Sequence, residues 1–183
     1  SVNSYNMCDY QVGLIGFGDI GHKIATRLKS FGTIVTAYDP YCADEKILEC
    51  GCKPMGLEEL IRTSDVVSIH ARLTEQTKNM FNAEMFAQMK PTAIFVNTAR
   101  AGLVDEDALI RALQEKKIGG AVLDVFREEP LPVDHPLRKL DNVTLAAHLA
   151  GTSQGTFKAS IGIVTEDLAR YARGEKLQHI MHG

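Results

Sequence analysis

Short runs of apolar, largely β-branched residues recur along the chain and alternate with segments in which apolar residues follow a helical period. The runs predict six strands, at Gln11–Ile15, Ile34–Tyr38, Val66–Ile69, Ala93–Val96, Ala121–Leu123 and Val143–Ala147. They are continuous apolar stretches rather than alternating ones, which is typical of a parallel sheet covered on both faces. The alternation of strands and helices therefore predicts an α/β fold with a doubly wound parallel sheet in three layers.

Apolar residues at helical spacing predict three helices. Asp19–Phe31 follows the first strand, and Asp105–Glu115 begins with acidic residues, which suit the positive end of a helix. A longer helix, Thr152–Arg173, is predicted after the last strand. Its apolar stripe consists of Phe157, Ile161, Val164 and Leu168. We expect this stripe to be partly exposed or to pack on another surface.

The composition excludes several classes of protein. Hydrophobic residues make up 45% of the 183 residues and charged residues 23%, as in an ordinary globular protein. The net charge of −3 is mild and the basic residues are scattered, so no nucleic-acid partner is expected. The apolar runs are too short to span a membrane. The cysteines lack the spacing of a zinc site, so we expect no metal, and reduced thiols in a cytoplasmic protein.

Polar residues stand where the predicted strands end. Asp39 follows the second strand, His70 the third, Asp124 the fifth and His148 the sixth, while Thr98 lies just beyond the fourth. The carboxyl ends of parallel strands lie along one edge of the sheet. In an open α/β sheet the ligand binds in the crevice outside that edge, so we expect these residues to line a common site.

A Gly-x-Gly-x-x-Gly motif lies between the first strand and the first helix. Gly16 would permit the tight turn, Gly18 the close approach of a pyrophosphate, and Gly21 the close packing of helix on strand. The free N–H groups of Asp19 and Ile20 would face the anion. A glycine-rich turn without a ligand is the alternative interpretation. The position of the motif, with Asp39 about twenty residues further on, favours a Rossmann-type dinucleotide site.

Asp39 also bears on the choice of cofactor. Its carboxylate could accept hydrogen bonds from the ribose hydroxyls of NAD, whereas the 2′-phosphate of NADP would place like charge against like. The next residues are Pro40, Tyr41 and Cys42, so no Arg follows closely. We therefore predict NAD. Asp124 could accept a hydrogen bond from the nicotinamide carboxamide, although a solvated carboxylate at a strand end is an equal alternative.

Three residues could supply the chemistry of hydride transfer between a 2-hydroxy acid and NAD. His148 could act as general base, Glu129 could orient and stabilise its charged form, and Arg100 could bind a substrate carboxylate. Each also has an ordinary interpretation: a structural histidine, a solvated charge run and a surface arginine. Spacing alone does not choose between these interpretations.

Several stretches resemble the D-isomer-specific 2-hydroxyacid dehydrogenases, and within them the 3-phosphoglycerate dehydrogenase-like branch. The stretches are 16–21, 97–106, 123–126, 128–130 and 148–151, in the order of that family. The resemblance implies that Arg100 binds the substrate carboxylate and carbonyl, Glu129 pairs with the base, and His148 is the general acid and base. Glu129 is chosen over Glu128 because it stands five residues after Asp124, as the acid of the family does.

The motif, the strand ends and the resemblance together define the expected cofactor contacts. They are Gly16, Phe17, Gly18, Asp19, Ile20, Gly21, Tyr38, Asp39, His70, Ala71, Thr98, Ala99, Asp124, His148, Leu149, Ala150 and Gly151.

The resemblance also bears on domain organisation. In that family the nucleotide domain is inserted within a substrate-binding domain, most of which lies upstream, but here about ten residues precede the first strand. We expect residues 1–183 to be the NAD-binding domain, with 152–183 a helix and tail that would return to a missing substrate domain. A homodimer through the nucleotide domain is left open.

Two classes of function remain. The first is an NAD-dependent oxidoreductase that interconverts a 2-hydroxy acid, by resemblance the D-isomer, and a 2-keto acid. The second is a non-enzymatic NAD(H)-sensing interaction module of the corepressor type. A third alternative is an inactive, isolated NAD-binding domain, because the wall that would close over the substrate is expected to lie in the missing domain.

Overall fold

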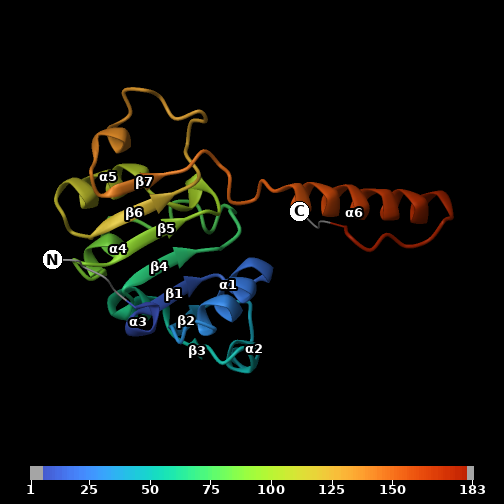
Figure 1. Ribbon diagram of the computed structural model, residues 1–183, viewed down its shortest axis with the longest axis horizontal. Coiled ribbons are helices and arrows are strands. Elements are labelled where there is room, and N and C mark those ends of the chain that lie inside the picture. The colour runs from blue at the N-terminus through green and yellow to red at the C-terminus, as the bar shows by residue number, and fades with distance from the viewer. Residues whose placement is uncertain (1–5, 181–183) are drawn as a thin grey trace. The chain divides into compact units, whose positions relative to one another are not determined.

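A parallel sheet organises the computed structural model, which describes residues 6–180 (Figure 1). Within that range the sheet has seven strands in the order β3-β2-β1-β4-β5-β6-β7, and every neighbouring pair is parallel. The strands are β1 (Gln11–Ile15), β2 (Ile34–Tyr38), β3 (Lys53–Pro54), β4 (Val66–Ile69), β5 (Ile94–Asn97), β6 (Gly120–Leu123) and β7 (Val143–Leu145). The strand order reverses beside β1, which makes the β1/β4 boundary the topological switch point. The predicted Rossmann-type α/β fold is confirmed.

Helices cover both faces of this sheet. The helices that connect the strands are α1 (Asp19–Lys29), α2 (Asp44–Glu49), α3 (Leu57–Thr63), α4 (Ala83–Gln88) and α5 (Glu106–Gln114). Short 3₁₀ turns lie at η1 (Met7–Asp9), η2 (Ala101–Leu103) and η3 (Pro136–Lys139). Ala25 of α1 and Ile47 of α2 pack with β1 and β2 in one apolar cluster. Side chains of α3, α4 and α5 pack with β4, β5 and β6 in the other, which gives the three layers expected.

The larger cluster is centred on three phenylalanines. Phe81, Phe86 and Phe95 are each at most 1% exposed, and their ring centroids lie 4.6–5.3 Å apart. Edge-to-face and tilted contacts at these separations are favourable for aromatic rings. The trio holds α4 and the bridge that precedes it against β5, which carries the segment 98–100 at its carboxyl end.

Several elements differ from the predicted ones. One strand, β3, was not predicted. It pairs with β2 through Lys53 and Pro54 only. Two residues are too few for a periodic pattern, and proline is depleted in strands because it lacks an N–H donor. The last strand ends at Leu145 rather than Ala147, and the first helix ends at Lys29 rather than Phe31.

The chain divides into two compact units, the first ending at Ala147 and the second beginning at His148. The second unit contains α6 (Gln154–Ala172), slightly shorter than predicted. The helix begins at a capping residue, Ser153, whose hydroxyl accepts a hydrogen bond from the Thr156 N–H at 3.0 Å. None of its residues is buried, and Phe157 of the predicted stripe is 70% exposed. No helix among residues 6–180 is long and apolar enough to cross a bilayer.

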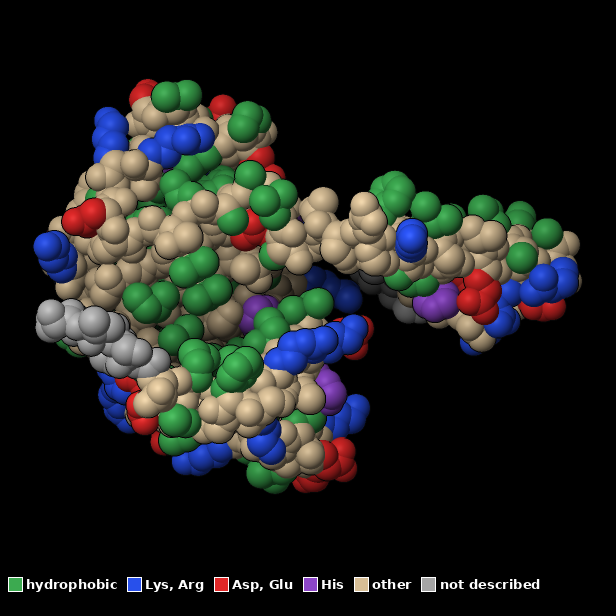
Figure 2. Space-filling model, in the orientation of Figure 1, with side chains coloured by type: hydrophobic (Ala, Val, Ile, Leu, Met, Phe, Trp, Pro, Cys, Tyr) green, Lys and Arg blue, Asp and Glu red, His purple; other side chains and the backbone are tan. Residues whose placement is uncertain are grey.

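Charged side chains are interspersed on the surface. Figure 2 shows Lys and Arg side chains mixed with Asp and Glu over the visible face of the first unit. This view has no continuous basic stripe of the kind that a nucleic-acid site requires.

Candidate functional site

The glycine loop joins β1 to α1 and lies against the end of β4. Gly16 has a φ of +97°, and a Cβ built there would be 2.7 Å from the main-chain nitrogen of Ala71. A Cβ on Gly21 would collide with the Gly16 carbonyl oxygen. These two positions therefore require glycine, one for its backbone angle and both for lack of space. By contrast, a Cβ on Gly18 would have no heavy atom within 4 Å, so the loop leaves open space above Gly18.

Asp39 lies at the end of β2 and holds the glycine loop. One carboxylate oxygen accepts a hydrogen bond from the Phe17 N–H at 2.7 Å, and the other accepts from the Tyr41 N–H at 2.9 Å. A carboxylate has about four acceptor positions, so two remain for hydroxyl donors. The arrangement places acceptors for a ribose beside the start of α1.

These features suit a dinucleotide. The first turn of α1 begins at Gly18, and Asp19 and Ile20 at its start are exposed. The unpaired N–H groups at a helix start attract a pyrophosphate. A pyrophosphate over Gly18 and a ribose at Asp39 would occupy the open space and the free acceptor positions. The residues present therefore fit NAD.

His70 follows β4 and is mostly buried. Burial lowers the pKa of its imidazole from 6.5 to about 4, because the charged form is poorly solvated there. The imidazole Nε2 lies 2.9 Å from the Ser68 hydroxyl, and the main-chain N–H of His70 donates to the Ile15 carbonyl at 2.6 Å. At neutral pH His70 is therefore an uncharged residue between the glycine loop and β4.

The segment from Asn97 to Arg100 forms a turn at the end of β5. The Asn97 Oδ1 accepts a hydrogen bond from the Ala99 N–H, and its Nδ2 donates to the Arg100 carbonyl, each at 3.0 Å. The Arg100 side chain is exposed, and its guanidinium donates to the Ala99 carbonyl at 2.6 Å. Thr98 is partly buried within the turn.

Asp124 and Glu129 follow β6, the neighbouring strand. The Asp124 N–H donates to the Asn97 carbonyl at 3.0 Å, and its residue is 3% exposed. Glu129 is exposed, and its Oε1 accepts a hydrogen bond from the Phe126 N–H at 3.0 Å. The fold thus brings Arg100, Asp124 and Glu129 to the carboxyl ends of two adjacent strands.

His148 to Gly151 belong to the second unit. His148 has a φ of +55° and is exposed, and its carbonyl accepts a hydrogen bond from the Thr152 hydroxyl at 3.2 Å. The Thr152 N–H donates to the Leu149 carbonyl at 2.9 Å, so the segment forms a turn that leads to α6.

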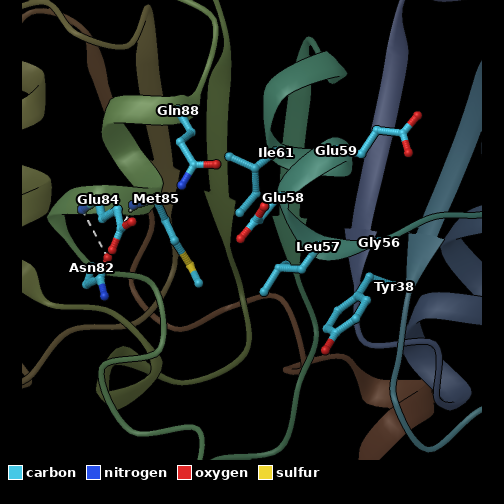
Figure 3. A pocket seen from close by; sticks show the side chains of 10 residues that line it. All are labelled: Tyr38, Gly56, Leu57, Glu58, Glu59, Ile61, Asn82, Glu84, Met85 and Gln88. Atoms are coloured by element: carbon cyan, nitrogen blue, oxygen red, sulfur yellow. Dashed lines mark hydrogen bonds between the residues drawn. The ribbon is translucent and has the colours of Figure 1, made fainter.

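A separate cavity of about 530 Å³ lies between α3 and α4 (Figure 3). Leu57, Ile61 and Met85 contribute its apolar lining, together with several polar and acidic side chains. Of the predicted cofactor contacts, only Tyr38 lines this cavity. Because Tyr38 is the last residue of β2 and directly precedes Asp39, the cavity adjoins the carboxyl end of β2.

The chain belongs to the D-isomer specific 2-hydroxyacid dehydrogenase family. The family model for the NAD binding domain matches residues 2–150, which is most of the chain. The match ends close to the boundary between the two structural units. Residues 2–150 thus match the NAD-binding domain of this family, as the resemblance implied.

Individual relatives support the same assignment. A glyoxylate reductase from Korarchaeum cryptofilum is 43% identical over 93% of this chain and 52% of its own length. A D-3-phosphoglycerate dehydrogenase from Methanocaldococcus jannaschii is 40% identical over 93% of this chain and 33% of its own. The crystal structure of D-lactate dehydrogenase with NAD+ from Lactobacillus jensenii superposes with a TM-score of 0.90 and 30% identity, covering 98% of this chain and 58% of that one. The chain therefore spans only a third to somewhat more than half of these relatives.

Two residues near the site were not among the predicted contacts. Asn97 and Ser68 are both buried polar residues, at 2% and 7% exposure, and each contacts a predicted site residue. Polar residues in otherwise apolar strands are the signal that could have identified them. In the part of the chain that is described, no cluster of three or more His, Cys, Asp or Glu side chains could hold a metal ion.

Proposed function

We propose that this domain carries the cofactor and the catalytic residues of an NAD-dependent oxidoreductase that interconverts a 2-hydroxy acid and a 2-keto acid. The carrying observation is the linkage at the ends of β5 and β6. The main-chain carbonyl of Asn97 accepts a hydrogen bond from the Asp124 N–H, and its side-chain Nδ2 donates to the Arg100 carbonyl. One residue therefore holds the backbones of both Arg100 and Asp124. Asp39 and the glycine loop lie at the same edge of the sheet, at the ends of β2 and β1, two to four strands away from β5 and β6.

Each of these residues has a defined task in the proposal. The Arg100 guanidinium binds the substrate carboxylate through its planar fork and polarises the adjacent carbonyl. Asp124 accepts a hydrogen bond from the carboxamide and so selects the ring face. When bound, NADH supplies two electrons and a hydrogen to the carbonyl carbon. Asp39 favours NAD over NADP because its negative charge would repel the 2′-phosphate of NADP.

Proton transfer is assigned to His148, with Glu129 as its carboxylate partner. In the reducing direction a protonated imidazole donates its proton to the substrate oxygen, and in the oxidising direction the neutral imidazole removes it. Glu129 would stabilise the charged imidazole and hold one tautomer. A general acid and base of this kind contributes about 10²–10⁴-fold to rate.

The substrate is proposed to be a small 2-keto acid or the corresponding 2-hydroxy acid, with the D configuration where C2 is a stereocentre. The relatives are named for glyoxylate, D-3-phosphoglycerate and D-lactate, which share a carboxylate next to the reacting carbon. The exposed stripe of α6 is proposed to pack on a substrate-binding domain, because four large apolar side chains on one helix are costly in water. The four cysteines are free thiols, which supports a cytoplasmic location.

The test is NADH oxidation by the protein with glyoxylate, pyruvate and 3-phosphohydroxypyruvate. His148→Ala should abolish turnover with any accepted acid and leave NADH affinity nearly unchanged. His179→Ala, an exposed histidine of the second unit, is the matched control and should keep activity. NADH-dependent self-association that is insensitive to His148→Ala, without turnover, would instead support a sensing module. Sedimentation at two concentrations, with and without NADH, tests that outcome and the homodimer together.

A further inference from the structure

Asn97 is a buried amide in the interior of the sheet, directly below the turn that carries Arg100. It is the last residue of β5, pairs in register with Ile69 of β4 and Leu123 of β6, and is 2% exposed. A buried amide is costly unless its polar atoms are hydrogen-bonded. Its position is therefore held by strands on both sides.

The amide uses both of its ends on the turn. The Oδ1 accepts from the Ala99 N–H and the Nδ2 donates to the Arg100 carbonyl, while the main-chain carbonyl accepts from the Asp124 N–H. The Arg100 carbonyl also accepts a longer hydrogen bond, 3.3 Å, from the Leu103 N–H. One side chain thus fixes the backbone on both sides of the peptide bond that leads into Arg100.

We infer that Asn97 is a positioning residue, which holds the backbone of Arg100 so that its guanidinium meets a substrate carboxylate in the correct orientation. This rests on the proposed function for the role of Arg100. Arginine has a long side chain, so a small rotation of its backbone displaces the fork by much more. A displacement of about 1 Å at a binding group is enough to weaken catalysis strongly.

Asparagine suits this position because it combines a donor and an acceptor on one short, planar group. Serine can accept from the Ala99 N–H but is too short to reach the Arg100 carbonyl. Alanine offers neither contact. Asn97→Ser and Asn97→Ala therefore remove one and both of the side-chain hydrogen bonds.

A matched control is available at the other edge of the sheet. The Asn142 Nδ2 donates to the Leu113 carbonyl at 3.2 Å, just before β7 begins. Asn142→Ala therefore removes a comparable amide-to-carbonyl bond at the amino ends of the strands, away from Arg100. It controls for a general loss of stability.

The experiment compares these three variants in hydrogen exchange of the Ala99 N–H, NADH Kd, and KM and kcat for the accepted 2-keto acid. Asn97→Ala should speed exchange at Ala99 and raise KM about tenfold, because a displaced guanidinium binds the carboxylate less well, with NADH Kd within about twofold. Asn97→Ser should restore protection at Ala99 but only part of the KM. Asn142→Ala should leave all of these unchanged.

Unchanged exchange at Ala99 in Asn97→Ala overturns the inference, whether or not the protein is active. Faster exchange with an unchanged KM also overturns it, because the turn would then not matter to the carboxylate. If NADH Kd and KM rise together in both Asn97→Ala and Asn142→Ala, the effect of Asn97 is on general stability and the inference fails. Absence of turnover by the domain when it is joined to its substrate-binding domain contradicts the proposed function instead, and faster exchange at Ala99 then still supports the hold on Arg100.

Discussion

Asp39 accepts a hydrogen bond from the main-chain N–H of Phe17 at 2.7 Å, so the carboxylate at the end of β2 is tied to the loop after β1. The two residues are 22 positions apart in the sequence, and the parallel pairing of β1 with β2 brings them together. Loop and carboxylate therefore form one preorganised unit. A ligand that uses both loses little entropy in ordering them.

Replacing Asp39 with alanine should weaken NADH binding by about tenfold to a hundredfold. The change removes the acceptors for the ribose and the anchor of the glycine loop, and hydrogen bonds to charged groups contribute roughly 1.5–3 kcal/mol. The ratio of NADPH to NADH affinity should rise, because the like charge is gone. Fluorescence titration with both cofactors measures this.

Asp44→Ala is the control for that change. Asp44 lies in the first turn of α2, is exposed, and has the same charge. It should alter neither cofactor affinity. Tighter binding of NADPH than NADH by the unaltered protein would contradict the role given to Asp39.

Two glycines of the same motif should respond oppositely to alanine. Gly21→Ala should destabilise the fold, because the new Cβ meets the Gly16 carbonyl oxygen and backbone must move. A cost of about 1–3 kcal/mol is expected for such overpacking. Gly18→Ala should retain stability, since its Cβ enters open space, yet lose NADH affinity. Urea unfolding and NADH titration of both variants separate the effects, and equal unfolding midpoints would refute the packing argument.

Stability should fall as the pH is lowered, partly through His70. The unfolded chain takes up a proton near pH 6.5, whereas the folded chain resists protonation of His70 down to about 4. The contribution of His70 to the free energy of unfolding is therefore complete above about pH 6.5. It is lost as the pH falls towards 4, by roughly 3 kcal/mol at most. His70→Gln should reduce this pH dependence, and His22→Gln, at an exposed position on α1, should not. Urea unfolding at several pH values within this range provides the measurement.

Phe95→Ala should cost about 3–5 kcal/mol of unfolding free energy, because it empties the centre of the aromatic trio. Phe31→Ala is the matched control, since Phe31 is 66% exposed and should cost less than about 0.5 kcal/mol. A similar loss in both variants would show that the trio does not dominate the core. The measurement is again the urea midpoint, taken without cofactor.

Local pattern was sufficient for much of this molecule. The apolar runs predicted six of the seven strands in the described range, and the glycine motif predicted the loop at the start of α1. The helices α2, α3 and α4 were not singled out, because six or seven residues give an apolar period too little length. The edge strand β3 was missed for the same reason. These failures concern the shortest elements.

The sequence by itself determined the period of each longer element, the position of the glycines and the polar residues at the strand ends, because these depend on neighbours along the chain. Only the tertiary structure decided that Asp39 holds the Phe17 N–H, that His70 is mostly buried and uncharged, and that the Asn97 carbonyl holds the Asp124 N–H. The physical reason is that burial and hydrogen-bond partners come from strands distant in sequence. Their alignment is set by the packing of the whole sheet.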